Sequence, residues 1–284
     1  MTRTVYVNGE FLLESDAKVS VFDRGFLFSD GVYEVTAVLG GKLVGWEGHI
    51  ARLKRCLTEI GMLLPESELK LLELHREIIE KNNLSEGIVY LQVTRGQKER
   101  DFLITDDTRQ SVVMFTQQID LLDPARLDRG LKITIDQDTR WGRNDIKTTQ
   151  LLASSLIKTG AVNRGFDDAW LERDGYITEG TSSNAFIVDQ QNNIVTRNLN
   201  CEILSGVTRS AIIQSTGMLG LKIEQRPFSI EEAKSAREAF ITSASNFVVS
   251  VIEIDGFTIG NGKIGPVTRS LREEYLAHII KTCV

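Results

Sequence analysis

Cysteine and histidine are both scarce in this sequence of 284 residues, and neither is clustered. The three cysteines, Cys56, Cys201 and Cys283, are widely scattered. This scatter favours reduced thiols in a cytoplasm over a disulfide framework. The three histidines, at positions 49, 75 and 278, are equally far apart. No spacing typical of metal ligands occurs, so we expect no metal site.

The chain also has no long hydrophobic run and no basic run. No stretch approaches the length of a membrane span, and no apolar signal region opens the sequence, so we expect no membrane partner. The net charge is -6, and no basic run could follow a nucleic-acid backbone, so we expect no nucleic-acid partner. With 42% hydrophobic and 25% charged residues, the composition is typical of an ordinary soluble globular protein. The length allows one large domain or two medium ones.

Residue periodicity predicts a mixed α/β fold that begins with hairpins around two helices. Asn8-Gly9 between apolar residues indicates one hairpin, and the alternating segment 31–38 followed by Gly40-Gly41 indicates a second. Apolar residues recur with helical spacing over 49–60 and over 67–81. In the second of these helices the apolar stripe is expected to contain Leu69, Leu72, His75 and Ile78.

Segment 120–130 contains Pro124 and Gly130 and breaks both periodicities, which predicts a linker. It would separate a smaller N-terminal α/β domain, 1–119, from a larger and β-rich C-terminal domain, 131–284. The further expected elements are helices after Lys147, over 207–218, behind the capping box at Ser229 and from about 265, and strands at 89–94, 112–116, 131–135, on both sides of Asp174-Gly175, near 240 and over 251–254.

Three segments carry groups that one kind of cofactor requires. Lys147 supplies an amine, Glu179 supplies a carboxylate, and Gly206-Val207-Thr208 opens a predicted helix whose exposed N–H groups favour an anion. Pyridoxal phosphate needs an amine to hold it, an acid beside its ring nitrogen and a seat for its phosphate. The sequence therefore predicts a pyridoxal phosphate site.

Each of these groups also has a plainer interpretation. Lys147 could be a solvated surface lysine, although Trp141 and Ile146 on one side and Leu151 and Leu152 on the other predict a segment packed against the core. In such a place a lysine amine can lose its proton and act as a nucleophile.

Glu179 is expected to end a strand, where it could pair with a ring nitrogen or simply belong to a polar turn. The helix start at 206–208 could bind a phosphate or could be an ordinary N-cap. Arg52 is a candidate charge partner for the phosphate because guanidinium binds phosphate in a bidentate manner, although an arginine on a helix is more often solvated.

Taken together, these segments resemble the class IV (fold-type IV) pyridoxal-phosphate aminotransferases, and most closely the D-amino-acid aminotransferases among them. The resemblance covers essentially the whole chain. Its ordered matches are residues 23–26, 30–35, 49–53, 90–96, 140–141 with 145–147, 178–184, 206–209 and 251–256.

The resemblance implies a two-domain fold-type IV architecture and a role for each matching residue. Lys147 would hold the cofactor and move a proton at the substrate's α-carbon, and Glu179 would pair with the ring nitrogen. Leu204 would pack on the ring face. The phosphate would be bound by Arg52, Val207, Thr208 and Ser245, and the substrate carboxylate by Tyr33 and Arg100.

The implied reaction is transfer of an amino group between a D-amino acid, such as D-alanine, and a 2-oxo acid. The implied assembly is a cytoplasmic homodimer in which the loop bearing Arg100 comes from the neighbouring subunit. In the D-specific pattern a histidine follows that arginine by two residues, whereas this chain has Phe102, which cannot donate a hydrogen bond to a carboxylate. A branched-chain L-amino-acid aminotransferase, an (R)-amine transaminase, an aminodeoxychorismate lyase and a non-catalytic phosphate-binding module remain as alternatives.

Overall fold

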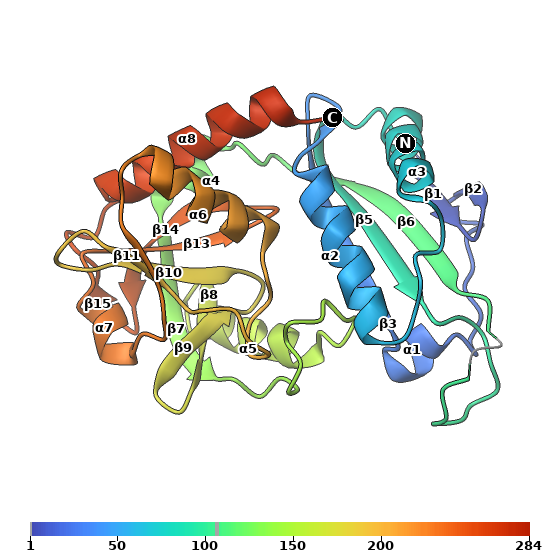
Figure 1. The fold of residues 1–284 in the computed structure, drawn as a ribbon, viewed down its shortest axis with the longest axis horizontal. Helices are drawn as coiled ribbons and strands as arrows, with labels where there is room; N and C mark the ends of the chain where they lie inside the picture. Colours follow the sequence, from blue (N-terminus) through green and yellow to red (C-terminus); the bar gives the residue numbers. More distant parts are fainter. Residues whose placement is uncertain (1, 106–107) are drawn as a thin grey trace. The chain divides into compact units, whose positions relative to one another are not determined.

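The computed structural model describes residues 2–105 and 108–284, which form two compact units (Figure 1). Unit 1 contains the described part of Met1–Leu121 together with Ile146–Gln150 and Thr282–Val284. Unit 2 contains Leu122–Asp145 and Leu151–Lys281. Both units combine helices with a β-sheet, which confirms the predicted mixed α/β class.

Unit 1 is built on a six-stranded antiparallel sheet in the order β2-β1-β6-β5-β3-β4. Both predicted hairpins are present, and Asn8 and Gly9 have φ values of 51° and 108°, as a tight turn between two strands requires. The strands are β1 (Thr4–Val7), β2 (Glu10–Leu13), β3 (Gly31–Leu39), β4 (Lys42–Leu43), β5 (Glu86–Thr94) and β6 (Ser111–Gln118).

Two long helices pack on this sheet, α2 (Trp46–Glu59) against β3 and α3 (Glu68–Lys81) against β1 and β6 (Figure 1). Both helices were predicted, but the predicted stripe of α3 is partly wrong. Leu69 is 67% exposed, and the helix instead buries a set of residues that follows its 3.6-residue period: Leu71, Leu74, His75, Ile78 and Ile79. The short helix α1 (Arg24–Phe28), which the periodicity did not predict, starts where Asp23 Oδ1 accepts the N–H of Gly25.

Unit 2 contains a nine-stranded mixed sheet in the order β12-β11-β10-β13-β14-β7-β8-β9, with β15 paired to β14. Its strands are β7 (Leu131–Gln137), β8 (Asp168–Arg173), β9 (Tyr176–Gly180), β10 (Asn184–Val188), β11 (Ile194–Thr196), β12 (Ile223–Gln225), β13 (Glu238–Ser243), β14 (Phe247–Ile254) and β15 (Phe257–Thr258). Its helices are α4 (Pro124–Arg129), α5 (Leu152–Asn163), α6 (Val207–Met218), α7 (Ile230–Lys234) and α8 (Pro266–Thr282). Ser229 and Glu232 form the predicted capping box at the start of α7.

Helix α4 lies inside the segment predicted as a linker, where Asp123 caps it and Pro124 occupies its first turn. The division of the chain into domains 1–119 and 131–284 stays a prediction. Among the described helices, none is both long enough and apolar enough to cross a membrane.

The lysine segment Ile146–Gln150, which was expected within the C-terminal domain, belongs to unit 1 by its contacts. The N–H of Tyr33 donates to the carbonyl oxygen of Lys147 over 3.0 Å, and Thr148 forms a β-bridge with Val32. Ile146 is buried in the core of unit 1. Backbone pairing with β3 therefore holds the lysine in unit 1.

His75 is a buried histidine in unit 1 that should make the stability of the protein sensitive to acid. Its Nδ1 lies 2.7 Å from the carbonyl oxygen of Leu71 and therefore donates to it, and its ring meets the ring of Trp46 edge-on at 4.8 Å. Burial lowers the pKa of His75 from 6.5 to about 4, although the hydrogen bond to Leu71 opposes this shift.

As the pH falls from 6.5 towards 4, the unfolded chain binds a proton at His75 that the folded chain does not bind. We expect this site alone to lower the free energy of unfolding by on the order of 3 kcal/mol across that window. Urea unfolding of the wild type and of His75→Phe at neutral and acid pH measures the effect. Equal pH dependence in the two proteins would contradict the prediction, since the other titrating groups are common to both.

Candidate active site

Lys147 lies in unit 1 beside the aromatic ring of Tyr33. Its Nζ is 4.2 Å from the centroid of that ring, and its backbone N–H donates to the Sγ of Cys56 over 3.3 Å. The side chain is half-buried. Tyr33 also stacks on Tyr90, with 5.5 Å between the ring centroids.

The prediction that apolar neighbours bury the lysine segment is wrong for three of the four residues. Ile146 is 4% exposed, but Trp141, Leu151 and Leu152 are 36%, 43% and 72% exposed. Pairing of the segment with β3 involves backbone groups, so it does not require these neighbouring side chains to be buried.

Arg52 projects from α2 into a buried group of charges. Its Nε and Nη2 donate to the two carboxylate oxygens of Glu34, each over 2.8 Å, and Nδ1 of His49 lies 2.7 Å from one of them. Burial raises the pKa of Glu34, but the charge and hydrogen bonds of Arg52 outweigh this effect and hold the pKa far below its usual range. Burial also lowers the pKa of His49. Glu34 therefore fixes the orientation of Arg52, and the phosphate-binding role of Arg52 stays a prediction.

Arg100 is exposed, and its guanidinium carbon lies 5.4 Å from the ring centroids of both Phe28 and Phe102. The two rings meet edge-on at 5.5 Å. The neighbouring backbone is held where Nη1 of Arg24 donates to the carbonyl oxygen of Asp101 over 2.6 Å. Where the D-specific pattern has a histidine, this chain therefore has an aromatic ring against the arginine.

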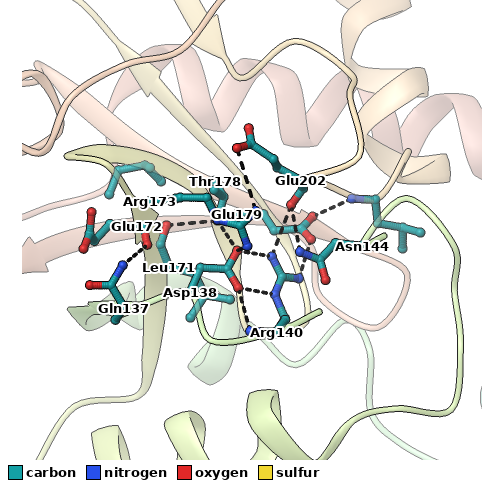
Figure 2. A network of polar contacts seen from close by, with 12 residues as sticks. Gln137, Asp138, Arg140, Asn144, Leu171, Glu172, Arg173, Thr178, Glu179 and Glu202 are labelled. Atoms are coloured by element: carbon teal, nitrogen blue, oxygen red, sulfur yellow. Dashed lines mark hydrogen bonds and ion pairs between the residues drawn. The ribbon is translucent and has the colours of Figure 1, made fainter. Parts of the chain in front are cut away.

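Unit 2 holds a second cluster of charges around Glu179, the penultimate residue of β9 (Figure 2). The prediction that Glu179 ends a strand is confirmed. Its Oε1 accepts from Nη1 of Arg140 over 2.6 Å, and its Oε2 accepts from Nδ2 of Asn184 at 2.9 Å and from the N–H of Leu204 at 3.0 Å. The carboxylate is only 4% exposed.

Asp138 holds Arg140 from the opposite side, as Figure 2 shows. The Nε and Nη2 of Arg140 donate to the two oxygens of Asp138 over 2.9 and 2.8 Å. The hydroxyl of Thr178 donates to the same carboxylate over 3.1 Å. Two acids thus share one arginine in a largely buried setting.

For each of these two acids, burial raises the pKa and pairing with Arg140 lowers it. Burial raises the pKa of Glu179 above its ordinary value, and Arg140 only partly offsets that rise. Burial also raises the pKa of Asp138, but the hydrogen bonds and charge of Arg140 outweigh it and lower the pKa. Of the two acids, Glu179 therefore binds a proton more readily.

The helix start predicted at 206–208 is present, and its N-cap residue is a glycine, which has no side chain to cap the turn. Gly206 is the N-cap residue with φ −66° and ψ 135°, and Val207 and Thr208 form the first turn of α6. This is the backbone geometry of an ordinary N-cap, so the phosphate-binding role of the turn stays a prediction. A β-carbon at Gly206 would lie 2.1 Å from Oδ1 of Asn184, so the close approach requires glycine.

Leu204 and Ser245 complete the set of predicted residues. Leu204 is joined to Glu179 through its N–H, and its carbonyl oxygen accepts from Nδ2 of Asn184 over 2.9 Å. Ser245 is half-buried in the turn between β13 and β14.

The structure brings Lys147 and Tyr33 together in unit 1, and Glu179 and Leu204 together in unit 2. Sequence reasoning did not assign roles to Glu34, Asn184, Asp138 or Arg140, which orient these groups. A signal was present for one pair, since the two-residue spacing of Asp138 and Arg140 at the end of a strand allows a local ion pair.

Solved structures of aminotransferases have the same fold. The chain is similar to the branched-chain amino acid aminotransferase of Escherichia coli, with a TM-score of 0.91 at 23% identity over 98% of this chain and 95% of that one. It is also similar to the branched-chain amino acid aminotransferase of Thermobaculum terrenum in its PLP form, with a TM-score of 0.86 at 21% identity over 98% and 94% of the two chains. These likenesses confirm the predicted fold-type IV architecture.

The sequence matches the family model of the class IV aminotransferases over residues 31–254. The chain is 36% identical to D-alanine aminotransferase of Staphylococcus aureus (strain N315) over 276 residues, which is 97% of each protein. It is 38% identical to D-alanine aminotransferase of Bacillus licheniformis over 268 residues, 94% of each. This chain belongs to the class IV aminotransferases, a family of enzymes that use pyridoxal phosphate.

Proposed function

We propose that the protein is a D-amino-acid aminotransferase that moves an amino group between D-alanine or a similar D-amino acid and a 2-oxo acid. Identity of 36% and 38% to two D-alanine aminotransferases, over nearly the whole chain, supports this substrate class. The observation that supports the chemistry is Glu179, a buried carboxylate held in one orientation by three donors.

The residues present fit pyridoxal phosphate. Glu179 is a buried acid that can keep a proton on a ring nitrogen, and the first turn of α6 has backbone N–H groups of the kind that bind a phosphate. When bound, the cofactor supplies an electron sink for negative charge at the substrate's α-carbon. Lys147 would hold it through its amine, Leu204 would contact the ring, and the phosphate would be bound by Arg52, Val207, Thr208 and Ser245.

Lys147 would also take the proton from the α-carbon of the amino donor in one half of the reaction and give a proton to the α-carbon of the new amino acid in the other half. A lysine amine can take a proton only when it is unprotonated and close to that atom. The backbone pairing of the lysine segment with β3 therefore positions Lys147 both to hold the cofactor and to act as a base. Tyr33, whose ring already contacts the Lys147 amine, would bind the substrate beside it.

Arg100 would bind the substrate carboxylate from the neighbouring subunit of a homodimer. Burial of exposed apolar side chains against a second subunit would favour such an assembly. In unit 1 they include Phe26, Phe102 and Leu103, and in unit 2 they include Leu152 and Leu156. The few and scattered cysteines support a cytoplasmic location.

The stereochemical preference gives the direct test. Purified enzyme with D-alanine and 2-oxoglutarate is expected to form pyruvate, and L-alanine under the same conditions is expected to give at least about 100-fold less, since two or three correctly placed contacts discriminate by that much. Lactate dehydrogenase and NADH report the pyruvate, and glutamate dehydrogenase with NAD⁺ reports the L-glutamate that transfer from an L-amino acid to 2-oxoglutarate would form. Reaction of L-alanine or L-leucine without reaction of D-alanine would contradict the proposal.

Other substrates and a measurement of cofactor binding separate the alternatives. Preference for branched-chain L-substrates or for (R)-amines would identify the corresponding transaminase. Release of pyruvate from aminodeoxychorismate without an amino acceptor would identify a lyase. A protein that binds no pyridoxal phosphate would be the non-catalytic module.

A further inference from the structure

The hydrogen bonds of Glu179 leave its carboxylate with one acceptor site. An ionised carboxylate has about four lone-pair sites, two on each oxygen. Oε2 receives two donors, from Asn184 and Leu204, whereas Oε1 receives one, from Arg140. Within residues 2–105 and 108–284, the site still open is therefore on Oε1, the oxygen that Arg140 holds.

Arg140 is itself fixed by more contacts than a surface arginine has. Its Nε and Nη2 form a fork on both oxygens of Asp138, and its Nη2 also lies 3.3 Å from the carbonyl oxygen of Glu202 (Figure 2). The side chain of Asp138 is 0% exposed and that of Arg140 is 12% exposed. A planar guanidinium held on one edge by a bidentate acid presents its remaining N–H in a single direction, which a lysine cannot do.

The charges of the cluster suit a positive group at the open site. Arg140 divides its charge between Asp138 and Glu179, and Arg173 lies 3.7 Å from the same Asp138 carboxylate. Arg140 contacts Glu179 through a single N–H on Oε1, so this carboxylate can still accept from a charged donor. Arg140 also opposes protonation of Glu179, which burial favours. An ionised Glu179 can stabilise a protonated ring nitrogen, whereas a protonated Glu179 cannot.

We propose that Arg140 is a positioning residue for the cofactor: it fixes Glu179 Oε1 as the oxygen that accepts from the ring nitrogen, and Asp138 holds Arg140 for this purpose. This inference rests on the proposed role of Glu179. Arg140 acts through Glu179, so its effect must depend on the presence of a ring nitrogen. That dependence distinguishes positioning from a general contribution to stability.

The test compares pyridoxal phosphate with 1-deazapyridoxal phosphate, in which C–H replaces the ring nitrogen. The cofactor-free protein is titrated with each compound and the dissociation constant is read from tryptophan fluorescence. Arg140→Lys is expected to weaken binding of pyridoxal phosphate by about tenfold to 100-fold, the usual effect of a lost hydrogen bond to a charged group. Binding of the deaza compound is expected to change by less than about threefold.

Two further variants keep the test decisive if Arg140→Lys does not fold. Asp138→Asn is nearly isosteric and is expected to show a smaller loss with the same selectivity for pyridoxal phosphate. Arg272→Lys is the matched control, because Arg272 is 11% exposed and likewise donates to an acid, Asp128, and to a backbone carbonyl. It is expected to change neither dissociation constant.

Glu179→Gln separates failure of this inference from failure of the proposed function. The proposed role of Glu179 is wrong if the wild type does not bind pyridoxal phosphate more tightly than the deaza compound, or if Glu179→Gln weakens the binding of both compounds equally. The inference about Arg140 is then overturned with it. Glu179→Gln could instead weaken only the binding of pyridoxal phosphate, while Arg140→Lys and Asp138→Asn weaken the binding of both compounds equally or of neither. In that case only the role of Arg140 is overturned.

Discussion

Replacement of Lys147 by alanine is expected to lower the rate of transamination by about 10⁴-fold or more. The variant loses the amine that would hold the cofactor and the base that would move the proton at the α-carbon, and general acid–base catalysis alone contributes about 10²–10⁴-fold. The rate with D-alanine and 2-oxoglutarate measures the loss. The visible absorbance of the cofactor is expected to shift to that of the unattached aldehyde, even where the variant still binds it.

Lys158→Ala is a suitable control for Lys147→Ala. Lys158 is 46% exposed and pairs with Asp168 over 3.3 Å, so its loss removes a positive charge without removing a group assigned to the site. We expect its rate to stay within about twofold of the wild type, as for most surface substitutions. A Lys147→Ala variant that retained both the absorbance band and the rate would eliminate Lys147 as the attachment point.

Local chemistry was sufficient to predict most of the elements near the site. The Asn8-Gly9 hairpin, the start of α6 at Gly206 and the capping box of α7 each depend on a few adjacent residues, and all three are present. The strand end at Glu179 followed from period-two alternation before it. Helix α1 was missed because it is only five residues long and depends on a cap at Asp23 rather than on an apolar period.

The surroundings of Lys147 could not be predicted in the same way. Apolar neighbours in the sequence predicted a buried segment. Its position is instead set by a β-bridge between Thr148 and Val32, which are more than 100 residues apart in the sequence. Glu34 and Arg52 meet for a similar reason, since one lies on β3 and the other on the helix that covers it. Pairings of this kind depend on tertiary packing, which a local pattern does not encode.

The cluster around Glu179 shows the same limit. A partner for a ring nitrogen was predicted from the residue type and its place at a strand end, but the arginine that holds it follows β7, and Asn184 begins β10. These segments meet only through the order of strands in the sheet of unit 2. The family resemblance therefore predicts a role for this carboxylate, while the structure shows which residues orient it.

Replacement of Glu179 by glutamine should show how much of the chemistry depends on that carboxylate. Glutamine keeps the size of the side chain but replaces one acceptor oxygen with an NH₂ group, which would face a donor from Arg140 or from Asn184 and Leu204. It also removes the negative charge that would keep the ring nitrogen protonated. We expect kcat for D-alanine to fall by about 10²–10³-fold, as when one preorganised electrostatic contact to a reacting centre is removed.

The matched variant is Glu172→Gln, because Glu172 lies on the adjacent strand β8 and its carboxylate accepts an exposed backbone bond from the N–H of Gly175 over 2.9 Å. Its kcat is expected to stay close to that of the wild type. Stopped-flow measurement of the half-reaction with D-alanine separates chemistry from product release. Loss of binding without loss of the half-reaction rate would mean that Glu179 holds the cofactor but does not promote the proton transfer. A slow half-reaction of Glu179→Gln at saturating cofactor would mean that the buried charge of Glu179 acts on the reacting centre. An unchanged rate in Glu172→Gln would show that loss of a negative charge from the neighbouring strand does not have this effect.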